Sequence, residues 1–587
     1  MSNPLDFCKT KPLFRYFLNY LTRLDGVHQV YEKWLQGGRS DIEGSEAFLD
    51  FVLMELGASL KLIDECWLDS VPKTGPLVIV ANHPLGGLEG MLLSQLMLKI
   101  RPDLKVMTNE LLLTFPEFKD LFIGVDILKG DQQQKNAKSL RLTTRHLLNG
   151  GALLVFPAGI VSHLNLKTGE VHDPDWNPMI AKLVKLAKAS CLPLYVEARN
   201  PTYFYLAGYL HKLLRTSLLP RVMLARKGSQ VSVHIRRPID YQELANIKDD
   251  RARINYLRFC CTLAPSAQSG EDQPAATEVA VKADVCQRQI ESKIADLAPS
   301  EIVRKGQFSV FSANYQQLGC VMEQLAIERE KTFRRESEGS GRELDSDDFD
   351  LHFQHLVVWD HDRKQIAGGY RVAKVDQVVR DVGLKGLYSS TLFDYDHDFV
   401  KQLGKAIEVG RSFVAPDYQG HPRILDMLWR GIGQYVAQNP EYHVLFGGVS
   451  ISKKYSSLAI NMLSDTFMYH YGADRSIRKK VRALHPVKID KKPWSKAHLK
   501  AFSEMAVINK LVGRIDTGKS IPILIRHYLM LNGKFISFSV NKGFSNSVDG
   551  LIMVDLKDCP EKYVRRYLGS DGYAQCTRIW ETESDAA

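Results

Sequence analysis

A histidine, three glycines and an acid stand close together near the start of this chain. The segment reads Asn82-His83-Pro84-Leu85-Gly86-Gly87-Leu88-Glu89-Gly90, so His83 and Glu89 are six positions apart. An imidazole can take a proton from a hydroxyl nucleophile, and a carboxylate can hold that imidazole in the required tautomer. Gly86 and Gly87 remove side-chain bulk where substrates would approach. An isolated His–Glu pair, however, more often caps a turn and a helix.

Two later segments carry further candidate residues in the same half of the chain. Phe156-Pro157-Ala158-Gly159 ends an apolar run, which places Phe156, Pro157 and Gly159 at the end of a candidate buried strand. Ala198-Arg199-Asn200-Pro201 follows another apolar run. Arg199 and Asn200 could line an acceptor site, or they could brace the turn in which they stand.

A second set of candidate residues is spread over the other half of the chain. Glu408 and Arg411 flank Gly410 near the end of a candidate strand. Residues three apart lie on opposite faces of a strand unless a bulge intervenes, which Gly410 would permit. A carboxylate can accept a proton from an attacking amine while an arginine holds substrate oxygens. Scattered charges of this kind more often form structural ion pairs. The other members of the set are Arg329, Phe333, Asp347, Asp350 and Arg371.

Apolar runs alternate with helical patterns in the first half of the chain. The runs at 77–81, 152–156 and 192–196 predict buried strands, and the patterns at 88–100 and 179–189 predict helices. Strands that alternate with helices are typical of an α/β domain, which we place at residues 1–263.

The second half of the chain begins after a small, polar stretch at 264–277 that predicts a flexible linker. We expect a second domain at 278–580, opening with a charged helix over 278–297. The Gly/Ser/Glu-rich stretch 337–345 predicts an exposed loop, and 581–587 a disordered tail.

The pattern within the second domain is a hairpin followed by strand, helix and strand. The hairpin strands are expected at 354–359 and 365–372, the later strands at 406–414 and 444–449, and the helix at 423–437. No internal repeat is apparent. The two halves are therefore expected to be different α/β domains.

The amino-acid composition narrows the classes of molecule that the chain could bind. The formal net charge of +10 suits an anionic membrane surface, an acidic carrier protein or nucleic acid, but no nucleic-acid-binding motif appears. The nine cysteines contain no C-x-x-C pair, which indicates reduced thiols and no metal site. No uninterrupted apolar run is long enough to span a bilayer. The aromatic and basic stretch 203–215 could lie in a membrane interface, or it could be a helix packed on its own domain.

The first set of motifs resembles the glycerolipid acyltransferase superfamily, whose motifs run N-H-x-x-x-x-D and F-P-E-G-T-R-S. The resemblance covers about residues 77–239 and implies that His83 is the catalytic base and Glu89 its orienting acid. Ala158 and Val161 replace the Glu and Arg of the later motif, and no arginine follows Phe122-Ile123. Such enzymes use these arginines on the acceptor's phosphate, so we do not expect a glycerol phosphate acceptor.

The variant pattern looks like the O-acyltransferases of aminolipid synthesis. That resemblance implies a substrate-binding role for the residues around the catalytic pair. These are Gly86, Gly87, Phe156, Pro157, Gly159, Arg199 and Asn200.

The second set resembles the acyl-homoserine lactone synthases and, more closely, the ornithine N-acyltransferases of the N-acetyltransferase-like (GNAT) superfamily. The resemblance spans about 304–568. It implies catalytic roles for Glu408 and Arg411, and substrate binding by the other five residues of the set. The turn that contains Gly420 and Arg423 leads into a helix, whose N-terminus could bind the phosphate of a phosphopantetheine arm.

These resemblances together predict an α/β protein in which a glycerolipid-acyltransferase-like domain is followed by a GNAT-like domain. The implied activity is synthesis of an ornithine lipid. The second domain would transfer a 3-hydroxyacyl chain from acyl carrier protein to ornithine, and the first would acylate the 3-hydroxyl of the resulting lyso-ornithine lipid. No metal or tightly bound cofactor is expected, since the carrier brings its own phosphopantetheine. The enzyme would act on the cytoplasmic face of the inner membrane and would not bind nucleic acid.

Two alternatives stay open from the sequence. The same two reactions could use glycine or another amino acid, because the motifs specify amine and hydroxyl acylation but not the head group. The chain could also be a haemolysin-like membrane-binding protein with degenerate transferase domains, since the Glu89 spacing and the arginine positions depart from the common pattern.

Overall fold

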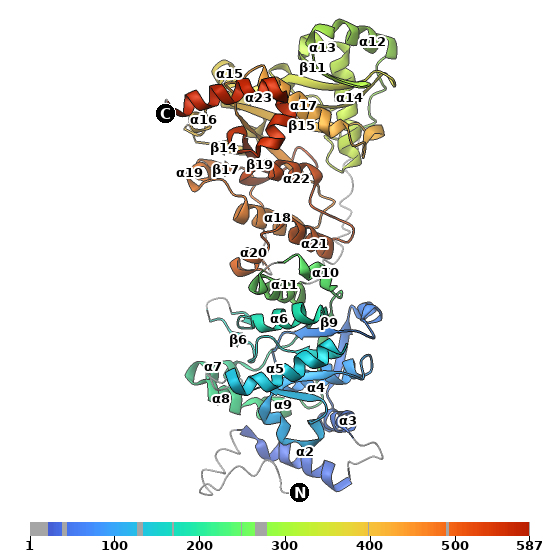
Figure 1. Ribbon diagram of the computed structural model, residues 1–587, viewed down its shortest axis with the longest axis vertical. Coiled ribbons are helices and arrows are strands. Elements are labelled where there is room, and N and C mark those ends of the chain that lie inside the picture. The colour runs from blue at the N-terminus through green and yellow to red at the C-terminus, as the bar shows by residue number, and fades with distance from the viewer. Residues whose placement is uncertain are drawn as a thin grey trace. The chain divides into compact units, whose positions relative to one another are not determined.

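The computed structural model describes residues 22–37, 44–125, 133–166, 169–247, 249–263, 279–396, 398–488, 492 and 494–585. These residues form two compact units (Figure 1). The described residues up to 263 make up the first unit together with 494–507, and the others make up the second. The linker expected at 264–277 lies outside the described residues.

The first unit is built on a mixed sheet in the order β1-β9-β8-β2-β5-β3-β4. Its pairs are parallel except β8–β9, which is antiparallel. The central strands are uniformly apolar because helices cover both faces of a parallel sheet. The strands are β1 (Ser59–Ile63), β2 (Leu77–Ala81), β3 (Lys105–Asn109), β4 (Phe122–Val125), β5 (Ala152–Val155), β8 (Ser190–Glu197) and β9 (Gln230–Ile235).

Helices follow β2, β4 and β8 in the first unit, as the sequence pattern predicts for an α/β domain, although no α-helix separates β1 from β2 or β3 from β4. The helices of this unit are α2 (Leu24–Gly37), α3 (Ser45–Leu56), α4 (Gly87–Leu98), α5 (Gln133–Leu148), α6 (Pro178–Ala187), α7 (Thr202–Leu210), α8 (Lys212–Ser217), α9 (Leu219–Leu224), α10 (Tyr241–Ala245) and α11 (Asp250–Thr262). A small hairpin, β6 (His163–Leu164) and β7 (Val171–His172), lies between β5 and α6.

One helix of the first unit comes from far along the chain. Figure 1 shows α20 (Lys496–Ala501) beside α11. The ring of Phe259 on α11 contacts Trp494, His498 and Phe502, at centroid distances of 5.1–6.3 Å. The sequence assigned this segment to the second domain, because local patterns contain no sign that its aromatic residues cover α11.

The second unit contains an eight-stranded sheet in the order β10-β11-β12-β13-β15-β16-β19-β18. All of its pairs are antiparallel except β15–β16. The strands are β10 (Glu301–Lys305), β11 (Phe308–Asn314), β12 (Gln354–Asp360), β13 (Gln365–Lys374), β15 (Ala406–Val414), β16 (Val444–Ile451), β18 (Lys534–Asn541) and β19 (Ser547–Asp555).

Two short strands and a set of helices complete the described part of the second unit, and α17 packs against α23 in Figure 1. The strands are β14 (Phe393–Tyr395) and β17 (Val481–Ala483). The helices are α12 (Gln287–Asp296), α13 (Tyr315–Leu318), α14 (Cys320–Arg335), α15 (Val375–Val382), α16 (Phe399–Leu403), α17 (Ile424–Ala437), α18 (Ser457–His470), α19 (Arg475–Arg478), α21 (Met505–Ile515), α22 (Ile523–Met530) and α23 (Glu561–Asp585).

Three expectations for the second half differ from the structure. The helix expected over 278–297 is helical only from Gln287 to Asp296. The tail expected to be disordered from residue 581 continues α23 as far as Asp585, because Trp580 is buried and bonds the main-chain oxygen of Pro440. The loop 337–345 is held rather than exposed, since the buried Glu330 carboxylate accepts hydrogen bonds from Ser340 and Gly341.

Two irregularities in the second sheet shape its site. β15 gains one extra residue relative to β13 between Gly410 and Phe413, which is a β-bulge, and Arg411 there has φ +49°. Pairing between β15 and β16 is recorded only as far as Glu408 and Phe446, although both strands continue. Beyond Glu408 and Phe446, the two strands therefore do not pair with each other.

Candidate functional site

His83 and Glu89 come together at the junction of β2 and α4. Nδ1 of His83 lies 3.0 Å from Oε1 of Glu89, and Glu89 is fully buried while the His83 side chain keeps 17% of its surface exposed. The same carboxylate oxygen accepts main-chain N–H bonds from Leu85 and Gly86 at 2.9 and 2.8 Å, which caps α4. An acid fixed in this way orients the imidazole and leaves its Nε2 edge available to take a proton.

The turn that carries His83 is fastened from three sides. Asn82 exchanges two hydrogen bonds with the main chain of Val196 on β8. The buried Asn200 amide donates to the main-chain oxygens of Pro84 and Leu85. Asn200 therefore braces the turn that carries His83, which is not the turn in which Asn200 itself stands.

The third set of contacts that hold this turn comes from Asp173, a residue that the sequence did not single out. Asp173 accepts a hydrogen bond from the main-chain N–H of His83 at 3.2 Å, and others from Ser162 and Trp176. Asp173 is buried and lies 90 positions from His83 along the chain. No local pattern would have linked the two.

The glycines and the Phe-Pro-Ala-Gly segment lie around the catalytic pair. The ring of Phe156 packs on His83 at a centroid distance of 4.5 Å. Gly86 has φ +104°, and a Cβ there would lie 2.6 Å from Leu219. That position therefore requires glycine. Gly87 and Gly159 line the adjoining cavity, whereas Pro157 is buried and its oxygen accepts from Asn177.

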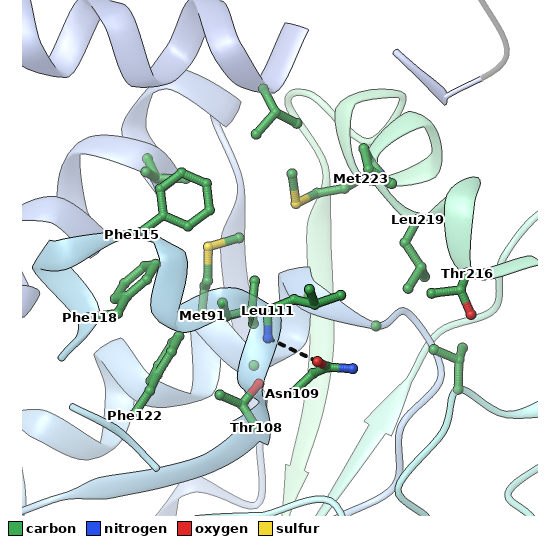
Figure 2. Close-up of a pocket in the computed structure, with 18 of the residues that line it drawn as sticks. Met91, Thr108, Asn109, Leu111, Phe115, Phe118, Phe122, Thr216, Leu219 and Met223 are labelled. Atoms are coloured by element: carbon green, nitrogen blue, oxygen red, sulfur yellow. Dashed lines mark hydrogen bonds between the residues drawn. The ribbon is translucent and has the colours of Figure 1, made fainter. Parts of the chain in front are cut away.

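A predominantly apolar cavity of about 460 Å³ begins at His83 and the glycines. Figure 2 shows part of its wall, where Phe115, Phe118 and Phe122 lie on one side and Leu219 and Met223 on the other. Side chains of α2 and α3 also contribute. A cavity of this size and lining suits an aliphatic chain.

Arginines lie near this cavity, but not at the motif positions. Arg199 is exposed and is absent from the described cavity lining. Arg215 does line it, and burial lowers the pKa of Arg215. Arg226 donates to the main-chain oxygen of Arg199, and burial lowers its pKa although Glu89 acts in the opposite direction.

The aromatic stretch 203–215 is two helices, α7 and α8, separated by the extended residue His211. Phe204 and Tyr205 on α7 are buried with Val161, Leu164 and Val222. The opposite side of α7 exposes four large apolar side chains, with Leu210 80% exposed. These are Tyr203, Leu206, Tyr209 and Leu210. The helix thus packs on its own domain and presents an apolar surface as well.

The second set of predicted residues forms one buried network in the second unit. Arg329 donates to Asp350 at 2.9 Å, and a nitrogen of the same guanidinium lies 3.2 Å from Nδ1 of His355. Arg371 donates to both Asp350 and Asp347. Burial alone would raise the pKa of Asp350, but Arg329 and Arg371 hold it well below its usual range. Burial and the charge of Arg329 lower the pKa of His355 to about 4.

Arg411 extends this network from the bulge in β15. Its Nε lies 3.0 Å from Oδ2 of Asp345, and its terminal nitrogens bond Asp347 and the hydroxyl of Tyr388. Phe333 lies on one side of the guanidinium, 6.0 Å from the ring centroid. Tyr388 and Asp345 were missed by the sequence analysis. Asp345 is brought in by the held loop 337–345.

Glu408 is buried on the same side of β15 as Arg411. Its two carboxylate oxygens accept main-chain N–H bonds from Tyr388 and Ser389, at 3.1 and 2.7 Å. The bulge therefore brings Glu408 and Arg411 to a common partner, Tyr388, as the spacing required. Burial raises the pKa of Glu408 despite these bonds, which favours a proton-accepting role.

Further carboxylates lie beside Arg411. Asp549 accepts hydrogen bonds from Ser450 and from Asn541, which also donates to the Tyr388 hydroxyl. Burial raises the pKa of Asp549. It also raises the pKa of the half-buried Glu338 to about 8, with Asp549 and Glu336 adding to the shift. Around Arg329, Arg371 and Arg411, carboxylates outnumber guanidinium groups.

Gly420 and Arg423 lie in the exposed turn between β15 and α17, and Arg423 is the residue before the first turn of that helix. Gly420 has φ +80°. Among the described residues, no group of three His, Cys, Asp or Glu side chains is placed to hold a metal ion. In the same residues, no helix combines the length and apolarity that a bilayer crossing demands.

Two family models match the chain. One, described as an acyltransferase, matches residues 62–266, and the other, described as an acetyltransferase (GNAT) domain, matches residues 329–430. The first range contains His83 and Glu89, and the second contains Glu408 and Arg411. The α/β fold expected from the sequence is confirmed, with an acyltransferase domain followed by a GNAT-type domain.

Curated relatives of two kinds are similar to the chain. A glycine N(alpha)-acyltransferase of Phocaeicola vulgatus is 27% identical over 45% of this chain and 85% of its own length. A lyso-glycine lipid O-acyltransferase of the same organism is 24% identical over 41% and 84%. An L-ornithine N(alpha)-acyltransferase of Agrobacterium fabrum is 25% identical over 40% and 75%. One chain thus resembles both N- and O-acyltransferases, which supports a bifunctional acyltransferase.

Proposed function

We propose that this protein makes ornithine lipid by two successive acylations on one chain. The GNAT-type domain transfers a 3-hydroxyacyl chain from acyl carrier protein to the α-amine of ornithine. The first domain then acylates the 3-hydroxyl of the resulting lyso-ornithine lipid. The observation that carries this proposal is the His83–Glu89 pair, which lies at an apolar cavity. The same chain contains a second candidate site, around the buried Glu408, that could acylate an amine.

In the first reaction, the amine nitrogen attacks the thioester carbonyl and the carbon–sulfur bond breaks. Glu408 accepts the proton lost by the amine and passes it to the departing carrier thiolate, which leaves as the thiol. Arg411 and Arg371 hold substrate oxygens, because guanidinium groups pair with carboxylates and carbonyls in fixed geometry. The turn at Gly420 and Arg423 offers a helix N-terminus to the phosphate of the pantetheine arm.

In the second reaction, Nε2 of His83 takes the proton of the 3-hydroxyl as its oxygen attacks a second acyl thioester. Glu89 stabilises the imidazolium that forms, and the proton returns to the departing thiolate. Phe156 confines the imidazole from one face. The apolar cavity holds an acyl chain away from water.

Ornithine is proposed as the head group because the second site is rich in carboxylates. An acceptor with a second ammonium group would offset the excess of carboxylates, among them Asp345 and Asp549, over the nearby arginines. Glycine is the second candidate, because two of the relatives carry glycine in their names. Rates with both amino acids and 3-hydroxyacyl carrier protein decide between them, and faster use of glycine would reject ornithine.

We also propose that the protein works at the cytoplasmic face of the inner membrane, where it takes its chains from an acidic carrier protein. The support is a net charge of +10 and the apolar surface of α7. A basic protein is attracted to anionic lipid and to an acidic carrier alike.

Lipid profiling tests the whole proposal. In a host that lacks aminolipids, the wild-type chain should produce a new zwitterionic two-chain lipid. Glu408→Ala should abolish both the mono-acylated and the di-acylated product, while His83→Ala should let the mono-acylated compound accumulate. A host with no new lipid would support a haemolysin-like binding protein with degenerate domains. Unchanged lipid from His83→Ala would refute the role of the first site.

A further inference from the structure

Arg215 is a cation in the wall of a predominantly apolar cavity. It is the one arginine among the described residues that line the cavity containing His83. No hydrogen bond or ion pair joins its guanidinium to another described residue, and its stem lies across α7, where a Cβ on Gly208 would be 2.8 Å from its Cδ. Burial removes part of the water that solvates this guanidinium, and no anion offsets the free-energy cost of that desolvation.

A second arginine lies close to the catalytic pair. Arg226 follows α9 and interacts electrostatically with Glu89. Its Nη2 donates to the main-chain oxygen of Arg199, while its buried Nε has no partner among the described residues. The phenol of Tyr205 on α7 interacts electrostatically with both Arg215 and Arg226. Arg215 lines the cavity, and Arg226 is tied to the main chain of Arg199, just before α7.

This placement fits an anion that the acceptor itself carries. In an N-(3-hydroxyacyl) amino acid, only a few covalent bonds separate the 3-hydroxyl from the free carboxylate. When the hydroxyl approaches His83, the carboxylate must stay near the same end of the cavity. The phosphate of an acyl donor instead lies at the far end of the pantetheine arm, well away from the reacting thioester. The two positions at which the resembled acyltransferases carry phosphate-binding arginines are occupied here by Gly124 and Val161, whose side chains carry no charge.

We propose that Arg215 binds the acceptor's carboxylate and so makes the first domain selective for N-acyl amino acids with a free carboxylate over 3-hydroxy lipids that lack one. The inference rests on the proposed O-acylation and adds the group that recognises the acceptor. Arg215 is here a specificity residue and takes no part in proton transfer.

The test compares two acceptors with the full-length protein and one acyl thioester donor. One acceptor is an N-(3-hydroxyacyl) amino acid, and the other is its primary amide, which has the same shape without the charge. Charge-assisted hydrogen bonds contribute enough that wild-type kcat/KM should be roughly 10- to 100-fold higher for the acid. Arg215→Met should remove most of this difference by raising the KM for the acid, with little change for the amide.

Two further variants make the result specific. Arg215→Lys should recover part of the preference for the acid, because it restores a charge without the planar guanidinium. Lys227→Met, which removes an exposed cation close to Arg226 in sequence, should leave both acceptors unchanged. O-acylation of the amide by the same preparations at the wild-type rate shows that the first unit of each variant is folded.

Three results would overturn the inference. One is equal use of acid and amide by the wild-type protein, and another is an Arg215→Met effect on the donor's KM alone, which would indicate a phosphate contact. The third is weaker binding of Arg215→Met to anionic vesicles with unchanged kinetics in detergent, which would indicate a headgroup contact. If the proposed role of His83 in O-acylation were wrong, the result would be different, because His83→Ala would still acylate both acceptors.

Discussion

Glu89 and Glu408 are buried carboxylates that are anchored alike and placed differently. Each accepts two main-chain N–H bonds from neighbouring residues, Leu85 and Gly86 for one and Tyr388 and Ser389 for the other. Glu89 lies against an imidazole. Glu408 has no histidine among its described hydrogen-bond partners, so in our proposal it is itself the base, whereas Glu89 only orients one. At this scale the two sites differ in which atom takes the proton.

Glu408 gives a prediction for pH dependence. Burial raises its pKa, so the carboxylate becomes protonated at a higher pH than an exposed glutamate would. A base works only when deprotonated, and kcat/KM for N-acylation should therefore fall on acidification through an apparent pKa above about 4.3. Glu408→Gln should lower the rate by roughly 10²- to 10⁴-fold at every pH.

Asp549→Asn serves as the matched control for that experiment, since Asp549 is also buried with a raised pKa. It should retain the acidic limb of the profile. If Glu408→Gln kept the wild-type rate and profile, the glutamate would be a purely structural anchor of the Tyr388 segment.

At the scale of elements, helices and strands far apart in sequence build each site. The first site needs the β2–α4 turn, the β6–β7 segment that contributes Asp173 and the α7–α9 helices. The second needs α14, the loop 337–345 and the bulge in β15. The bulge holds Arg411 at φ +49°, a conformation that non-glycine residues adopt only when surrounding contacts enforce it.

The exposed side of α7 predicts membrane binding. Leu206 and Leu210 are 49% and 80% exposed, and burying a leucine in lipid contributes about 1.5–3 kcal/mol. Replacing both with serine should weaken binding to anionic vesicles by well over tenfold, as measured by co-sedimentation. Leu186→Ser, at an equally exposed leucine on α6, should bind as the wild type does. Equal loss in both variants would mean that α7 has no special role.

The packing of α20 on α11 predicts a stability effect from a distant residue. Phe502 is fully buried against Phe259. Phe502→Ala should destabilise the first unit by about 3–5 kcal/mol, because the transfer free energy is lost and a cavity remains. Thermal unfolding monitored by loss of O-acylation would show the shift, and Lys500→Ala on the exposed side of α20 provides the control. An unchanged midpoint for Phe502→Ala would contradict this packing.

At the scale of the whole molecule, the two reactions share one chain but not one set of residues. The product of the N-acylation site is the acceptor of the O-acylation site, so the order of the reactions follows from their chemistry. Each described unit contains its own catalytic candidates and its own core. We therefore expect the two activities to be separable by mutation.

A mixing experiment tests this separation. Full-length His83→Ala and full-length Glu408→Gln should each fail to make the di-acylated lipid from free amino acid. Their mixture should restore it, because the mono-acylated intermediate made by one protein can be used by the other. Product yield is measured against an equal amount of wild-type protein. A mixture that made none, although each variant kept its remaining activity, would show that the intermediate must pass within a single chain.

The strands and the catalytic spacing could be predicted from the sequence, because they are local. The strands expected at 77–81 and 406–414 are β2 and β15 with the same bounds, since the pattern of a buried strand lies in consecutive residues. The need for a bulge between Glu408 and Arg411 could also be inferred from their spacing. The extent of α23 could not be predicted, because Trp580 bonds the main chain of Pro440, 140 positions away. The anchoring of loop 337–345 could not be predicted either, because it depends on the burial of the Glu330 carboxylate that binds it.

The sequence by itself determined the two acyl-transfer signatures, their order along the chain and the two α/β domains, because motifs and apolar periodicity are properties of neighbouring residues. Only the tertiary structure decided which further groups meet them. Asp173 behind His83, Tyr388 between Glu408 and Arg411, Arg215 in the cavity wall and residues 494–507 on α11 were all settled there. Each depends on contacts between segments tens to hundreds of residues apart, and such contacts are selected by burial and hydrogen bonding in the folded chain rather than by local preference.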